Sequence, residues 1–214
     1  MDDILRQMGV VLREMRSLEH EGRPAKVVVA SRVYDTSVED LWDALTNPDR
    51  IPRWFLPISG DLKLGGRYQF QGNAGGTITA CEPPRRLAAT WEGPGGPTSW
   101  VELRLERETD DRTRLTLEHM AHVAGDFWDR FGPGAVGVGW DGALMGLGRH
   151  VDTGAAADPG KALEWAMSDE GKAFNTACSE AWGQAAMAAG ADPAQARAAA
   201  ARTTAFYTGA PVPE

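Results

Sequence analysis

The stretch Val101-Glu102-Leu103-Arg104-Leu105-Glu106 alternates apolar and charged residues, and it decides the fold class of this chain. Successive side chains of a β-strand point to opposite faces, so such a run has one apolar face and one solvated face. The turn Asp110-Asp111-Arg112 follows, and residues 115–119 repeat the alternation. The two runs predict adjacent antiparallel strands whose apolar sides face a common core.

The same pattern extends over residues 58–120. Short alternating runs are separated about every ten residues by turns rich in glycine, proline, asparagine or aspartate. We therefore predict an antiparallel meander of about six strands. A further strand is predicted at 26–35. It is followed by a helix at 38–45, capped by Thr36 or Ser37, and by a short helical turn before Trp54.

Helices are predicted at both ends of the chain. Apolar residues spaced by four and three over 2–20 predict an N-terminal helix, which either packs on its own domain or forms a short dimerisation seam. A glycine-rich helix is predicted at 134–151, where the glycines indicate a close backbone approach or room left for another group. Three short helices are predicted within 158–207, each preceded by a capping residue: Asp158, Ser168 and Asp192.

Composition excludes several classes of function. The net charge is -8 without any run of Lys and Arg, so the basic face that nucleic acids require is not expected. Two cysteines are too few for a disulfide framework. The N-terminus lacks the order of a signal peptide, and no stretch reaches the ~18 apolar residues of a membrane span. The expected location is the cytoplasm.

Residues 26–151 resemble a known family at six places in order: 42–48, 53–55, 65–70, 83–91, 113–119 and 139–140. These segments are similar to the START-like (SRPBCC) superfamily, and most like bacterial homologues of the C-terminal domain of the Hsp90 ATPase activator. The resemblance implies an α+β helix-grip fold, in which a curved antiparallel sheet holds a long C-terminal helix around a cavity. Together with the helices predicted at both ends, it divides the chain into three parts: an N-terminal helix at 1–22, the START-like domain at 26–151 and a helical extension at 158–207.

Members of this superfamily bind lipids, polyketides or other small apolar molecules, and some are cyclases or aromatases. The resemblance therefore implies binding of a small, largely apolar molecule in an internal cavity, without catalysis. One alternative is a cyclase, aromatase or hydrolase on the same fold, and another is a stress-related or chaperone-related interaction module. The expected partner is a small apolar molecule, and a homodimer through 2–20 or the C-terminal helices is an alternative that the sequence leaves open.

The predicted ligand-binding residues are aromatic and apolar side chains near the elements that should surround the cavity, because rings offer large and rigid contact area. They are Trp42, Trp54, Phe55, Tyr68, Phe70, Trp91, Leu103, Leu117, His119, Trp128, Trp140 and Leu144.

His119 is in phase with Leu117 and should face inward, so it is the candidate for a general-acid or ligand-orienting group. His119 and His122 lie three apart on a strand and should point to opposite faces, so no metal site is expected. The glycine spacing at 137–142 matches the dinucleotide-binding fingerprint, but the strand that this fingerprint requires before it is not predicted here. We therefore expect no cofactor.

Overall fold

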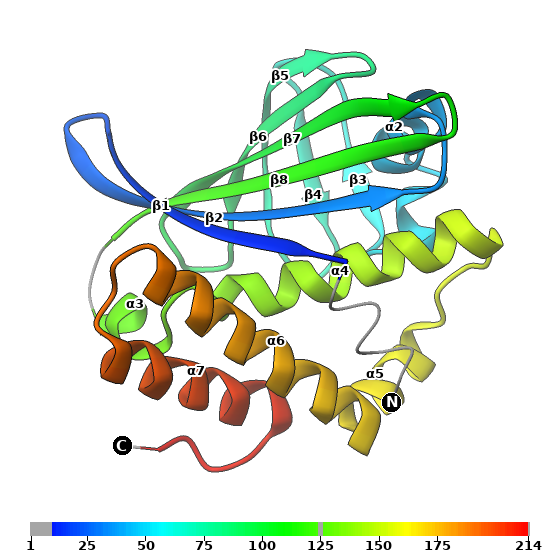
Figure 1. Cartoon of the computed structure of the whole chain (residues 1–214). Helices are drawn as coiled ribbons and strands as arrows, with labels where there is room; N and C mark the ends of the chain where they lie inside the picture. The colour runs from blue at the N-terminus through cyan, green and yellow to red at the C-terminus, as the bar shows by residue number, and fades with distance from the viewer. Residues whose placement is uncertain (1–9, 124–125, 214) are drawn as a thin grey trace. The chain divides into compact units, whose positions relative to one another are not determined.

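The computed structural model describes residues 10–123 and 126–213, and Figure 1 traces its elements in chain order. The eight strands form one sheet with the order β1-β2-β8-β7-β6-β5-β4-β3. Strands β3 to β8 are the predicted six-stranded antiparallel meander, and β1 and β3 are the two edges. The strands are β1 (Leu12–His20), β2 (Arg23–Tyr34), β3 (Ile58–Gly60), β4 (Arg67–Phe70), β5 (Gly75–Glu82), β6 (Arg86–Glu92), β7 (Thr98–Thr109) and β8 (Arg112–His122).

The helices begin where the capping side chains predict. Ser37 accepts a hydrogen bond from the Asp40 backbone N–H, and Asp158, Ser168 and Asp192 cap their helices in the same way. Among the described residues, no helix has both the length and the hydropathy needed to cross a bilayer. The helices are α2 (Val38–Thr46), the 3-10 turn η1 (Ile51–Arg53), α3 (Asp126–Phe131), α4 (Gly134–Thr153), α5 (Pro159–Met167), α6 (Asp169–Ala188) and α7 (Pro193–Thr208).

The chain divides into two compact units, and β2, β8 and α4 each run from one into the other. Unit 1 consists of Met1–Ala30, His122–Gly142 and Asp158–Glu214, and unit 2 consists of Ser31–Ala121 and Ala143–Ala157. The division into three consecutive parts that the sequence suggested remains a prediction.

Unit 2 contains the meander, α2, η1 and the C-terminal part of α4. Its core includes Leu41 of α2, Leu115 of β8 and Leu147 of α4, all almost fully buried. Leu103 of β7 lies opposite Leu117 of β8, so the apolar sides of the two strands share one face as the alternation predicts.

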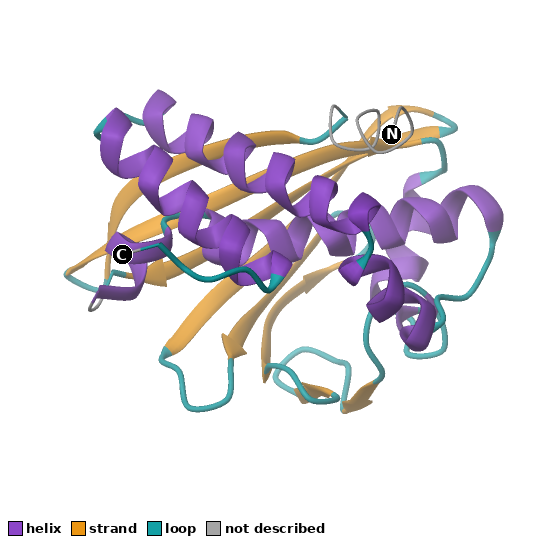
Figure 2. Ribbon diagram, turned by 90° about the horizontal axis from the view of Figure 1, so that it is seen from below, coloured by secondary structure: helices purple, strands orange, loops and turns teal. Residues whose placement is uncertain are grey.

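Unit 1 contains β1, the first part of β2, the N-terminal part of α4 and helices α3, α5, α6 and α7. Figure 2 shows α6 and α7 side by side, and α3 also contacts α7. Trp182 and Cys178 of α6 are both fully buried, and Trp182 is the largest such side chain among the described residues.

The helix predicted at 2–20 is wrong for the part that the structure describes, because Leu12–His20 is strand β1; residues 1–9 lie outside the described residues. A tight turn at Glu21 and Gly22, with φ of 51° and 72°, connects β1 to β2. Two successive residues with positive φ are typical of a hairpin turn that matches strand twist. Leu12–His20 therefore pairs with β2 as a strand, although the spacing of its apolar residues is that of a helix.

Two glycines of α4, Gly137 and Gly148, mark close approaches, which is one of the two explanations that the sequence suggested. A Cβ at Gly137 would lie 2.2 Å from the Trp182 ring in unit 1. In unit 2, a Cβ at Gly148 would lie 2.4 Å from the Arg32 guanidinium. Any other residue would overlap these groups, so the glycines let buried side chains rest directly on the helix backbone.

Candidate functional site

The apolar face of the meander in unit 2 carries several of the predicted site residues. Strand register places Ser99, Val101 and Leu103 of β7 on the same face as Leu117 and His119 of β8. The neighbouring strand β6 adds Leu87, Ala89 and Trp91, which lie opposite Leu103, Val101 and Ser99. We call this surface the inner face.

A connected series of rings lies at one end of the inner face. The Trp54 and Phe55 rings are 5.6 Å apart, and Phe55 meets Phe70 edge to face at 5.0 Å. Phe70 contacts Tyr68 at 5.5 Å and Trp91 at 5.8 Å. The structure therefore brings five predicted aromatic residues together from the segment after η1, from β4 and from β6.

The polar atoms of two rings are anchored, which fixes their orientation. The Trp54 indole N–H donates to the Ala44 carbonyl at 2.9 Å, and the Tyr68 hydroxyl donates to the Thr90 carbonyl at 2.7 Å. Burial raises the pKa of Tyr68 above its ordinary value, so the phenol stays neutral. The apolar surfaces of the Trp54 and Tyr68 rings are therefore the parts that can contact another apolar group.

The inner face is unevenly covered. Leu105, Leu115 and Leu117 are buried, whereas Trp91 and Leu103 are only half-buried. Every residue of β6 keeps intermediate exposure, although β6 lies between β5 and β7. A central strand normally loses one face to the core. Apolar area therefore stays accessible around the ring series.

His119 and Ser99 form a buried polar pair next to the rings. His119 Nε2 lies 2.8 Å from Ser99 Oγ, and the Ser99 hydroxyl donates to the Trp91 carbonyl at 3.0 Å. Because the hydroxyl proton is directed at that carbonyl, the imidazole is the donor to Ser99. The His119 ring also meets the Trp91 ring at 6.1 Å.

Burial lowers the pKa of His119 to about 4, because the charged imidazolium is desolvated. At neutral pH the ring is therefore uncharged. A neutral ring that donates to Ser99 does not abstract the serine proton and is a poor general acid. The pair is better suited to orienting a polar group than to hydrolysis.

The sequence alone does not show which face of the sheet Arg32 occupies, and the structure buries it. Its guanidinium donates to the Leu144 carbonyl at 3.2 Å and lies 5.0 Å from the centre of the Tyr34 ring. The Tyr34 hydroxyl donates to the same carbonyl at 3.0 Å. Arg67 and Arg114 instead pair with the carboxylates of Glu92 and Glu108.

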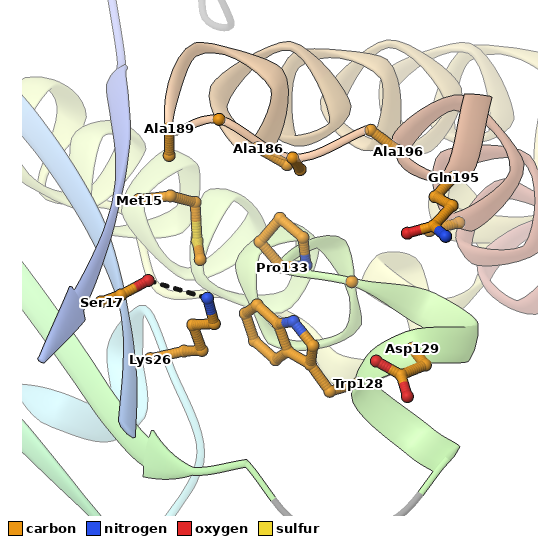
Figure 3. A pocket seen from close by; sticks show the side chains of 14 residues that line it. Met15, Ser17, Lys26, Trp128, Asp129, Pro133, Ala186, Ala189, Gln195 and Ala196 are labelled. Carbon is orange, nitrogen blue, oxygen red and sulfur yellow. Dashed lines mark hydrogen bonds between the residues drawn. The ribbon is translucent and has the colours of Figure 1, made fainter. Parts of the chain in front are cut away.

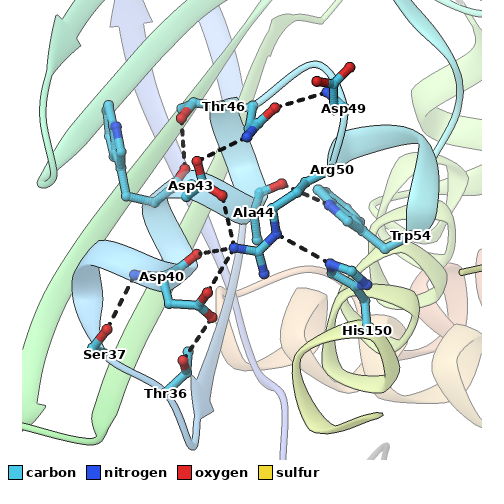
Figure 4. Close-up of polar contacts among 12 residues, drawn as sticks. Thr36, Ser37, Asp40, Asp43, Ala44, Thr46, Asp49, Arg50, Trp54 and His150 are labelled. Carbon is cyan, nitrogen blue, oxygen red and sulfur yellow. Dashed lines mark hydrogen bonds and ion pairs between the residues drawn. The ribbon is translucent and has the colours of Figure 1, made fainter. Parts of the chain in front are cut away.

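A second polar cluster joins α2 to the C-terminal end of α4 within unit 2 (Figure 4). Arg50 donates to Asp40 at 2.8 Å and to Asp43 at 3.0 Å, and its Nε–H donates to His150 at 3.4 Å. His150 Nδ1 in turn lies 3.0 Å from the Ala155 carbonyl. The hydrogen bond from Arg50 lowers the pKa of Asp40. Every group in this cluster has a structural partner, so it serves the fold.

Unit 1 has a small pocket of its own, about 190 Å³ in volume (Figure 3). Trp128, Met15 and Pro133 point into it, and Lys26 donates to Ser17 at 2.7 Å beside it. Its volume is below the roughly 300–1,000 Å³ of sites that enclose a typical ligand. The pocket is therefore the lesser candidate.

Four predicted residues lie neither on the inner face nor in the ring series. Trp42 is half-buried on α2, and Leu144 is buried on α4. Trp128 lines the pocket of unit 1, and Trp140 is half-buried in that unit. Whether any of the twelve residues touches a ligand remains a prediction.

Sequence reasoning missed Ser99 as the partner of His119. The signal was available in the register of β7 against β8, since Ser99 falls in phase with Val101. It also missed His20 and Glu21, because a helix was predicted there. These two residues lie close to His122 in unit 1.

Comparison with known proteins places the chain in a family. Residues 35–152 match the family model described as "Activator of Hsp90 ATPase homolog 1-like protein". The crystal structure of CalU16 from Micromonospora echinospora is 34% identical, with a TM-score of 0.66 over 83% of this chain and 98% of that chain. Its solution NMR structure is 35% identical, with a TM-score of 0.70 over 84% and 96%.

Protein MLL2253 from Mesorhizobium loti is 25% identical, with a TM-score of 0.52 over 59% of this chain and 96% of that chain. No match was found among curated proteins. The chain belongs to the family of Activator of Hsp90 ATPase homolog 1-like proteins, within the START-like superfamily. The α+β helix-grip fold class expected from the resemblance is thereby confirmed.

Proposed function

We propose that this protein binds a small, largely apolar molecule against the inner face of the sheet in unit 2. The observation that carries the proposal is the half-buried state of Trp91, Leu103 and the side chains of β6, beside a connected series of rings. Covering 100 Å² of such surface contributes roughly 2.5 kcal/mol. A ligand that covers it would gain affinity without needing charged contacts.

The His119–Ser99 pair supports one polar group on the ligand. Both side chains are buried, and both lie next to Trp91. Sites for apolar ligands commonly combine an apolar lining with a few such polar groups that fix orientation. A molecule with one hydroxyl or carbonyl on a flat apolar body fits this arrangement best.

The test uses two neighbouring alanines of β6. Ala89 lies opposite Val101 on the inner face, whereas Ala88 lies opposite Glu102 on the other face, and both are half-buried. Ala89→Phe would occupy the accessible area, and Ala88→Phe is the matched control. The purified full chain is screened by thermal shift against fatty acids, sterols and flat aromatic compounds.

We expect at least one compound to raise the melting temperature of the wild type and of Ala88→Phe, because a ligand that binds only the folded state stabilises it. Ala89→Phe should lose the response while keeping its own melting temperature within a few degrees. A screen without any response, or one in which both variants respond equally, would refute the inner-face site.

The cyclase or hydrolase alternative needs a proton-transfer group, and the neutral donor state of His119 argues against it. Turnover by the wild type that His119→Ala abolishes would restore that alternative. Self-association through the N-terminal segment or the C-terminal helices remains a prediction, and analytical ultracentrifugation of the full chain measures it directly.

A further inference from the structure

We propose that His20, Glu21 and His122 form a binding site for Zn²⁺ in unit 1. Each side chain offers one ligand atom, and the three atoms lie within 4.8 Å of one another. His20 is the last residue of β1, Glu21 lies in the turn to β2, and His122 is the last residue of β8. Strand ends far apart in sequence thus bring two imidazoles and a carboxylate together.

The geometry is close to what a zinc ion requires. His20 Nε2 lies 3.9 Å from Glu21 Oε1, and the two imidazole rings are 5.5 Å apart between centroids. Ligand atoms in a tetrahedral site with bonds of about 2.0–2.1 Å lie roughly 3.4 Å from each other. The side chain of Glu21 is 72% exposed, so a small rotation closes the remaining gap.

The donor set favours zinc over harder cations. Two imidazole nitrogens and one carboxylate oxygen are a common protein ligand set for Zn²⁺, whereas Ca²⁺ and Mg²⁺ prefer oxygen atoms alone. Three protein ligands leave a fourth position for water or a small anion.

The surroundings of His122 orient its ring. Its Nδ1 atom lies 3.4 Å from the Pro24 carbonyl, which also accepts the Val123 backbone N–H. An imidazole that donates Nδ1–H to a carbonyl carries its lone pair on Nε2, as in many histidine ligands of zinc. The carbonyl of β2 thus selects the tautomer that binds metal.

The backbone of Glu21 determines where its carboxylate lies, in the turn between β1 and β2. Its φ of 51° is in the left-handed region, and Glu21 is the one residue other than glycine with positive φ in the described parts of the chain. Glycine or asparagine adopts this conformation at lower cost. The turn thus carries a carboxylate beside the two imidazoles, although glycine would fit its backbone better.

A bound ion would join the β1–β2 turn to the end of β8 and would stabilise the folded state. To test this, the tag-free full chain is freed of metal with a chelator and titrated with Zn²⁺ by calorimetry. Co²⁺ serves as a spectroscopic substitute, because its visible spectrum reports coordination. Ca²⁺ is the control ion.

The variants are His122→Ala, Glu21→Gly and Glu19→Gln. Glycine fits the positive φ of the turn, so Glu21→Gly removes the carboxylate without straining the fold. Glu19→Gln removes an exposed carboxylate of β1 that is outside the cluster, and it is the matched control.

We expect one equivalent of Zn²⁺ to bind the wild type and Glu19→Gln and to raise their melting temperatures. Binding should weaken at least about tenfold in His122→Ala and in Glu21→Gly, with loss of the Co²⁺ spectrum. Absence of Zn²⁺ binding by the wild type, or equal binding by all four proteins, would overturn the proposal.

Discussion

The guanidinium of Arg13 holds both carboxylate oxygens of Asp141, with its Nε atom 3.1 Å from each. Trp182 completes the arrangement, since its indole N–H donates to the same carboxylate at 2.9 Å. The side chains of Arg13 and Asp141 are 8% and 1% exposed. Strand β1, helix α4 and helix α6 therefore meet in unit 1 at a buried ion pair.

Arg13→Met should lower the free energy of unfolding by about 3–5 kcal/mol, because it leaves the Asp141 carboxylate buried without its cation. The double variant Arg13→Met/Asp141→Leu should be less destabilised than Arg13→Met alone, although Trp182 loses its acceptor. Urea unfolding of the wild type and the variants measures both effects. A double variant with a lower free energy of unfolding than the single variant would show that the ion pair itself supplies net stability.

Two glycines of α4 should respond in opposite directions to alanine. A Cβ at Gly137 would overlap the ring of Trp182, whereas a Cβ at Gly142 would have no atom within 4 Å. We expect Gly142→Ala to stabilise the protein by up to about 1 kcal/mol through helix propensity. Gly137→Ala should destabilise it by about 1–3 kcal/mol through overpacking. Melting temperatures of the two variants provide the comparison, and equal shifts would contradict the packing described for Trp182.

The stability of the protein should rise with pH across the window set by His119. The folded-state pKa is about 4, below the ordinary value near 6.5. Between these values the unfolded chain binds more protons, so stability is lost as the pH falls from about 6.5 toward 4. The loss amounts to at most about 3 kcal/mol. His119→Gln should flatten this part of the urea-midpoint profile, and an unchanged slope would show that other groups cause it.

Arg50 should contribute less to the free energy of unfolding than its number of contacts implies, because the Asp40 and Asp43 side chains are 44% and 49% exposed. Arg50→Lys replaces a planar fork by a single ammonium, so we expect a loss of about 1 kcal/mol that shrinks in high salt. The control is Arg112→Lys, whose ion pair with Asp35 is more exposed and should contribute little. Equal losses in both variants would argue against a special role for the Arg50 cluster.

The meander could be predicted from the sequence because its signals are local. The alternation at Val101 to Leu105 and the turn at Asp110 determine which side chains share a face. Caps such as Ser37 and Asp192 are equally local, since their side chains bond backbone groups two or three residues away.

Strand β1 could not be predicted in the same way, because its partners are distant. The apolar residues of 2–20 fit a helix as well as a strand, and contacts with Asp141 and with α6 come from more than a hundred residues away. The hairpin turn was also missed because its sequence is Glu21-Gly22, whereas Asn-Gly or Asp-Gly is the sequence typical of such a turn.

The ring series was predicted in composition but not in connectivity. Phe55 follows η1 and Phe70 ends β4, and only the folded chain shows that their rings touch. The position of Arg32 depended on the face of β2 that α4 covers. Neither fact is present in one stretch of sequence.

The two edge strands of the sheet differ in how well they are protected against pairing with a strand of another chain. Strand β3 has three residues and offers little backbone for another chain to pair with, whereas β1 has nine. Along β1 the exposed side chains include Glu14, Arg16 and Glu19, and charges of this kind discourage strand addition. Replacing these three residues by neutral ones would leave the unpaired backbone groups of β1 available and remove the charges that oppose pairing. The altered chain would then be prone to fibrous assembly.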